Sequence, residues 1–222
     1  MKIYEIDCKI KPNYDIALKD LQDELYKHTN FAIDRHCDIL YKDSKYSFGG
    51  LVPLEQSKIY KKGKQYFSKI RTLDEKFAID LQQAILKDRS AISISDANIK
   101  ELTQTKITEL YSVTPVTVSV DDRFWVDTNG IELLKELIQD NLLFKYHNFF
   151  NVTLPLRGSF IESIEVKNKH PLRVVINDIN MIGNKITIIP KQDINSQKLA
   201  FTALALGIGE NNLIGCGFCI GK

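Results

Sequence analysis

The 222-residue sequence has a single tryptophan, few cysteines and no long apolar run. No stretch approaches the roughly 20 apolar residues that a membrane-spanning helix requires. Residues 1–8 alternate in polarity and lack the apolar core of a secretory signal. The four cysteines, Cys8, Cys37, Cys216 and Cys219, are too few for a disulfide scaffold in a chain of this size. We therefore expect a cytoplasmic protein with free thiols and no association with membranes.

The overall composition is that of an ordinary globular protein, with 44% hydrophobic and 26% charged residues. This balance excludes a disordered tail or a fibrous repeat. The length suits either one large domain or two small domains of about 110 residues each. The net charge of +2, from 30 basic and 28 acidic side chains, indicates little about partners.

The distribution of charge indicates more, because one segment is strongly basic. Six cations occur within residues 58–71 with no acidic residue among them: Lys58, Lys61, Lys62, Lys64, Lys69 and Arg71. A local excess of positive charge is typical of a surface that binds a polyanion. The alternative is a hairpin face that is merely solvated.

Hydrophobic periodicity predicts an α+β protein built from two tandem ferredoxin-like domains. In the first half we expect strands and helices in the order β-α-β-β-α-β over residues 3–10, 15–28, 45–54, 65–71, 73–87 and 107–113. The second half repeats this order over residues 116–126, 130–146, 160–166, 172–189, 193–206 and 216–220. The predicted domains are residues 1–113 and 114–222.

A glycine-rich segment near the C-terminus has an unusual arrangement. In residues 205–218, a predicted helix ends at a G-x-G motif, a short polar loop follows, and a G-x-G-F motif begins a predicted strand. A dinucleotide-binding fingerprint needs a strand, then glycines, then a helix, so the order here excludes that fold. We expect Gly207 to end the helix with a positive φ. The remaining glycines are expected to let a second chain lie close to the backbone.

This loop resembles the C-terminal glycine-rich loop of the repeat-associated mysterious proteins (RAMPs) of CRISPR systems. More narrowly, the chain resembles the CRISPR repeat-specific endoribonucleases. Residues 112–118 (SVTPVTV) are similar to the strand that opens the second domain of that family, and residues 141–146 (NLLFKY) to its N-L-x-x-K-Y helix end. Residues 53–66, with Pro53-Leu54 and Tyr60–Tyr66, resemble bacterial members. The resemblance covers essentially the whole chain.

The resemblance implies that the protein binds repeat RNA and cleaves precursor CRISPR RNA once within each repeat. The reaction needs neither metal nor cofactor: the ribose 2′-hydroxyl attacks the adjacent phosphate and leaves a 2′,3′-cyclic phosphate and a 5′-hydroxyl. The alternative is a non-catalytic member that holds guide RNA within a CRISPR effector complex. Association with other effector subunits and homodimer formation are both open. A metabolite-binding regulator would leave the basic segment unexplained.

The resemblance also implies a catalytic histidine shortly after the first helix, since histidine exchanges protons near neutral pH. We choose His36, which follows the predicted helix 15–28 by about one loop. His28 is the alternative, although its spacing from the apolar helix positions indicates a structural residue. Tyr41, Lys42 and Lys45 are the nearest candidates to assist, a lysine by stabilising the phosphorane and a tyrosine by orienting the ribose or donating a proton.

For RNA binding we expect phosphate contacts from the basic segment and from the glycine-rich loop. The candidates in the loop are Gly207, Gly209, Asn211, Asn212, Gly215 and Gly217. Cys216 and Cys219 form a C-x-x-C pattern without a second pair of ligands, so we expect packing rather than a metal site. Trp125 is likewise expected in the core rather than on an RNA-stacking surface.

Overall fold

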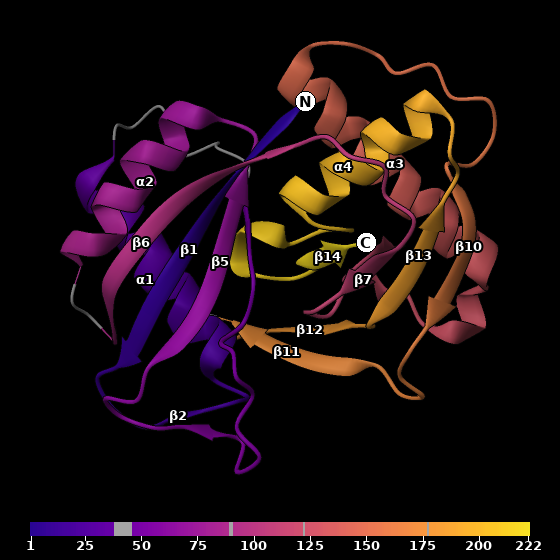
Figure 1. Cartoon of the computed structure of the whole chain (residues 1–222). Coiled ribbons are helices and arrows are strands. Elements are labelled where there is room, and N and C mark those ends of the chain that lie inside the picture. Colours follow the sequence, from indigo (N-terminus) through magenta and orange to yellow (C-terminus); the bar gives the residue numbers. More distant parts are fainter. Residues whose placement is uncertain (38–45, 89–90, 122, 177) are drawn as a thin grey trace.

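The computed structural model describes residues 1–37, 46–88, 91–121, 123–176 and 178–222. Two four-stranded antiparallel sheets lie side by side, each with two helices (Figure 1). The strand orders are β3-β5-β1-β6 and β10-β13-β7-β14. When the four strands of each sheet are numbered in the order in which they occur along the chain, both sheets have the strand order 2-3-1-4. This is the ferredoxin-like arrangement. The predicted fold class, two tandem ferredoxin-like domains, is confirmed.

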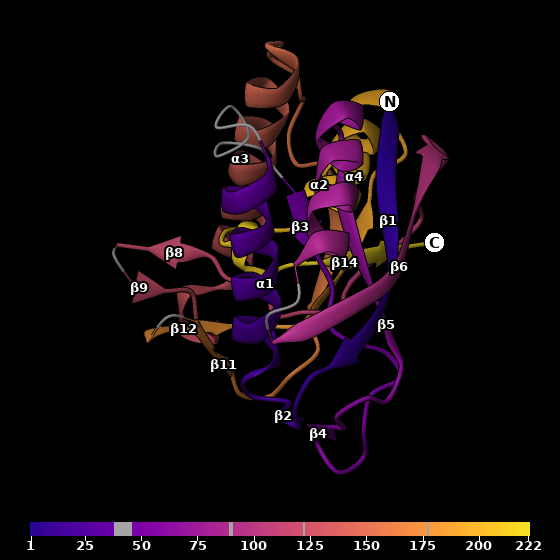
Figure 2. The same ribbon diagram turned by 90° about the vertical axis from the view of Figure 1, so that its left-hand side faces the viewer.

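The first domain packs its helices α1 and α2 on one face of its sheet (Figure 2). Its elements are β1 (Lys2–Pro12), β2 (Ile16–Ala17), α1 (Leu21–His36), β3 (Tyr46–Phe48), β4 (Ile59–Tyr60), β5 (Tyr66–Thr72), α2 (Glu75–Lys87) and β6 (Ile92–Thr103). The alternation predicted along residues 3–10 is observed, because Ile6, Cys8 and Ile10 are buried in this core.

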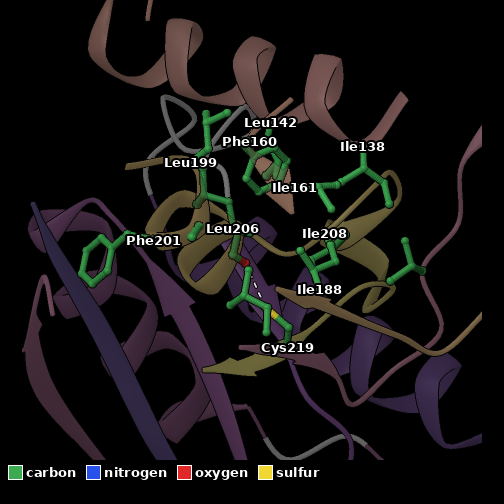
Figure 3. Close-up of a cluster of buried hydrophobic side chains, with 14 of the residues drawn as sticks. Ile138, Leu142, Phe160, Ile161, Ile188, Leu199, Phe201, Leu206, Ile208 and Cys219 are labelled. Carbon is green, nitrogen blue, oxygen red and sulfur yellow. Dashed lines mark hydrogen bonds between the residues drawn. The ribbon is translucent and has the colours of Figure 1, made fainter. Parts of the chain in front are cut away.

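The second domain has a core of its own, formed mainly by α3, α4 and its sheet, to which Ile3 and Leu73 of the first domain also contribute (Figure 3). Its elements are β7 (Leu110–Ser112), β8 (Ser119–Val120), β9 (Arg123–Phe124), η2 (Asp127–Asn129), α3 (Ile131–Phe150), β10 (Ile161–Val166), β11 (Leu172–Ile176), β12 (Ile179–Gly183), β13 (Ile186–Pro190), α4 (Ile194–Leu206), η3 (Asn212–Ile214) and β14 (Cys219–Gly221). Helix α4 also contacts β3 and β5, and Phe201 extends from it toward the first sheet (Figure 3).

The predicted strand at residues 107–113 was assigned to the wrong sheet. Strand β6, which the periodicity missed, completes the first sheet by pairing with β1. Strand β7 instead lies between β13 and β14 in the second sheet. The chain therefore changes sheets within residues 104–109, earlier than the predicted division at 113/114. Since β6 is an edge strand, many of its residues are polar and reach solvent, so its sequence lacks the regular apolar alternation that predicts a strand.

The first helix also differs from its prediction, because it spans Leu21–His36 rather than residues 15–28. Ile16 and Ala17 pair with β4, which keeps this segment extended. The buried stripe that begins at Leu21 and Leu25 continues through Ala32 and Ile33, so packing extends the helix. Within the described residues, we find no helix long and apolar enough to cross a membrane.

Candidate RNA-binding site

The glycine-rich loop, residues 207–218, is held between the two domains. Gly207, Gly209, Gly215 and Gly217 all have positive φ, between +67° and +88°, and all are buried. A Cβ on Gly209 would lie 2.5 Å from the Thr117 carbonyl oxygen. The space beside these glycines is therefore occupied by the protein's own atoms. The interpretation that they leave room for RNA is wrong, and their requirement is intramolecular.

The two asparagines of this loop have different surroundings. Asn212 is buried, and its Nδ2 donates to the carbonyl oxygens of Ile208 (3.1 Å) and Cys216 (2.9 Å). These bonds tie the two ends of the loop together, so its prediction as an RNA donor is wrong. Asn211 is only half-buried, and its Nδ2 donates to the Thr117 hydroxyl at 3.1 Å. Asn211 stays a candidate for RNA contact.

The C-terminal end of α4 is capped by side chains from elsewhere in the chain. A helix ends with carbonyl oxygens that lack partners within the helix. From the first domain, the Ser47 hydroxyl donates to the Ala205 oxygen (2.9 Å), and Arg71 donates to the oxygens of Leu204 (3.2 Å) and Cys219 (2.6 Å). Lys145 of α3 donates to the oxygens of Gly207 (2.8 Å) and Gly209 (2.6 Å). These bonds position the loop relative to both domains.

Arg71 is consequently unsuited to bind RNA. Its side chain is buried, with Nε 2.6 Å from the Glu5 carboxylate, and its guanidinium lies over the Phe218 ring at 4.6 Å. Lys69 contacts the same Glu5 and lies 3.1 Å from Asp7. The expectation that Arg71 contacts phosphate is therefore wrong, because its donors are used to join the two domains.

The lysines of residues 58–64 are exposed, but two of them are paired. Lys61 lies 2.9 Å from Asp15 and Lys64 lies 2.5 Å from Glu55. The side-chain ammonium groups of Lys58 and Lys62 have no acidic partner among the residues that the structure describes, although the backbone N–H of Lys62 donates to Asp15 Oδ1 at 2.8 Å. The basic segment is thus partly neutralised by acids from outside it, and Lys58 and Lys62 are the cations most available to a polyanion.

The two candidate histidines differ in accessibility. His36 is the last residue of α1 and is exposed, rather than lying in a loop beyond the helix. His28 is buried in α1, with Nδ1 3.6 Å from Asp88 Oδ1. Because a general acid or base must reach its substrate, His28 is excluded by this burial. The other predicted catalytic residues, Tyr41, Lys42 and Lys45, lie outside the described residues.

A hollow of about 430 Å³ lies between α3, the start of β3 and the glycine-rich loop. Its lining includes Tyr46, Asn141, Phe144, Lys145, Glu210 and Asn211. Burial raises the pKa of the Tyr46 phenol, which keeps it neutral. Sequence reasoning assigned no role to Asn141 or Phe144, although both lie in the helix-end segment 141–146. The three-residue spacing of Asn141 and Phe144 could have indicated a shared site, because it places both side chains on one face of a helix.

The cysteines and the tryptophan serve packing, as predicted. Cys216 and Cys219 are buried in different hydrophobic clusters, and burial raises the pKa of each thiol to about 12. Trp125 is buried in the second core, where its Nε1 donates to the Gly130 oxygen at 3.0 Å.

Comparison with known proteins finds solved structures of similar fold, all at low sequence identity. No protein-family model matches the chain, and no curated protein matches it either. Among similar solved structures, a "CRISPR associated protein Cas6" has a TM-score of 0.76 at 17% identity and covers 99% of each chain. "An RAMP protein binding different RNA substrates" has a TM-score of 0.77 at 15% identity, again over 99% of each chain. A "Cas6 product complex" has a TM-score of 0.60 at 14% identity, over 99% of this chain and 100% of that one. Over its whole length, this chain has the double ferredoxin-like fold of the Cas6 and RAMP proteins.

Proposed function

We propose that this protein binds CRISPR repeat RNA and cleaves precursor CRISPR RNA once within each repeat. The observation that carries the proposal is the likeness to Cas6 and RAMP structures across whole chains, one of them a product complex. The glycine-rich loop, the segment 112–118 and the helix end 141–146 support it independently, because they resemble the same family in sequence.

In this proposal, cleavage proceeds by attack of the ribose 2′-hydroxyl on the adjacent phosphate, without a metal ion. His36 exchanges a proton with the 2′-hydroxyl or with the departing 5′-oxygen, a role that its exposure permits. Tyr41, Lys42 and Lys45 remain the candidates to orient the ribose and to stabilise the charge of the phosphorane. Lys58 and Lys62 bind phosphates along the RNA.

The test is incubation of the protein with repeat RNA in the presence of EDTA, followed by analysis of the RNA ends. We expect a single cut per repeat, a 2′,3′-cyclic phosphate and a 5′-hydroxyl. His170→Ala, which alters another exposed histidine, is the matched control for His36→Ala. RNA that is bound tightly but remains intact would contradict the nuclease proposal and favour a subunit that holds guide RNA.

A further inference from the structure

The hollow between α3 and the glycine-rich loop is better suited to a neutral ligand than to a phosphate. Its volume of about 430 Å³ lies within the range of small-ligand pockets. The two charged side chains in its described lining, Lys145 and Glu210, have opposite signs, and each is already bonded. Lys145 donates to the oxygens of Gly207 and Gly209, whereas the Glu210 carboxylate accepts from the backbone N–H (3.2 Å) and hydroxyl (2.6 Å) of Ser119. Among the residues that the structure describes, the lining of the hollow therefore carries no excess of positive charge.

Two side chains on the same face of α3, Asn141 and Phe144, line the hollow. Phe144 is 62% exposed at the hollow, although an aromatic ring usually lies in the core. One turn earlier, the Oδ1 of Asn141 is buried, yet it accepts no hydrogen bond from any residue that the structure describes. A buried acceptor without a donor costs free energy, which an N–H group of a ligand would recover. An aromatic face beside an amide is the combination that recognises a nucleobase.

We propose that this hollow binds one unpaired nucleobase of the RNA. The inference rests on the proposed function in one respect, namely that the ligand is RNA. The base stacks on the Phe144 ring, and one of its N–H groups donates to Asn141 Oδ1. Because the hollow is lined by Tyr46 of the first domain and by α3 of the second, the base fixes the RNA between the two domains.

The experiment measures the affinity of a dye-labelled decamer of riboadenylate, by fluorescence anisotropy, at several salt concentrations. Phe144→Ala is expected to weaken binding roughly 5- to 100-fold, as loss of a stacking contact does. Asn141→Leu is expected to weaken it roughly 3- to 10-fold. Phe144→Trp retains an aromatic face and should bind nearly as tightly as the wild type. In every variant the dependence on salt should stay unchanged, because no phosphate contact is lost.

Ile194→Ala is the matched control, since it truncates an exposed apolar residue at the opposite end of α4 from the hollow. Wild-type affinity in Phe144→Ala, or an equal loss in Ile194→Ala, would overturn the inference while leaving the proposed function intact. A salt slope smaller by about 0.7 in Phe144→Ala would also overturn it, because that change indicates a lost phosphate contact. If the wild-type protein binds no RNA at all, both proposals fail.

Discussion

Gly217→Ala is expected to destabilise the fold without acting on RNA directly. The residue has a φ of +68°, a conformation that costs an L-amino acid about 1–2 kcal/mol. Its new methyl group would also overlap the Ile208 carbonyl oxygen, which is backbone and cannot rotate away. Relief requires displacing two hydrogen bonds, from Ile208 N–H to the Gly217 oxygen (2.9 Å) and from Gly217 N–H to the Pro115 oxygen (2.8 Å). Each contributes about 1 kcal/mol, so the total loss should be about 3–4 kcal/mol.

The matched control is Gly63→Ala, which shares the positive φ (+72°) but has no atom within 4 Å of its Cβ position. This control should lose only about 1–2 kcal/mol, so the two variants isolate the effect of crowding. For a chain of this length, the difference of about 2 kcal/mol corresponds to a melting temperature about 4–8 °C lower for Gly217→Ala. Thermal unfolding provides the measurement, beside an RNA-binding titration below both transitions. Equal melting temperatures together with a large loss of RNA affinity in Gly217→Ala alone would refute this reasoning.

Four further changes test the site and its support. Arg71→Met removes one member of a buried ion pair and should lower the free energy of unfolding by about 3 kcal/mol in urea titration; a loss under about 1 kcal/mol would contradict the assigned role. His36→Ala should slow repeat cleavage by roughly 10²- to 10⁴-fold while RNA affinity stays within a few fold, and wild-type turnover would refute the assignment. Lys62→Ala should reduce the salt slope of single-stranded RNA binding by about 0.7, whereas an unchanged slope would show that this lysine meets only solvent. Hydrogen bonds from the Ser196 side chain and backbone hold the pKa of the Asp193 carboxyl below its ordinary value. The ionised carboxylate therefore stabilises the fold fully above about pH 4, the pKa of an unfolded Asp. This stabilisation is lost as the pH falls through the lower pKa of the folded state. The difference in melting temperature between wild type and Asp193→Ala should therefore shrink on acidification, and a constant difference would disprove this linkage.

Local pattern alone was sufficient for most secondary structure and for the fold class. Alternating residues in β1 and β5 and the helical stripe in α2 each reflect one buried face, whereas the apolar residues of α4 reflect a helix that is buried on nearly all sides. The order of these elements predicts two ferredoxin-like domains, and short motifs in the second half resemble a family whose solved structures share this fold. The packing roles of Trp125 and Cys219 also followed from local context.

Local pattern failed where an element draws its stability from distant partners. Strand β6 was missed because hydrogen bonds to β1 hold it in the sheet, and its mixture of polar and apolar residues does not indicate this pairing. Helix α1 runs through His36 because Ala32 and Ile33 pack into the first core. The end of a helix or sheet is thus decided by what the rest of the chain places against it.

The chemistry of the candidate site depended even more on tertiary structure. The basic segment contains no acid in sequence, yet folding brings Asp15, Glu55 and Glu5 against its cations. The glycines of the loop at residues 207–218 proved to be an internal requirement, because protein atoms fill the space beside each of them. Sequence alone therefore determined most of the elements, the fold class and the family that the chain resembles. Only the tertiary structure decided which charges and surfaces remain free for a ligand such as the proposed RNA, since ion pairs and burial arise between residues from different parts of the chain.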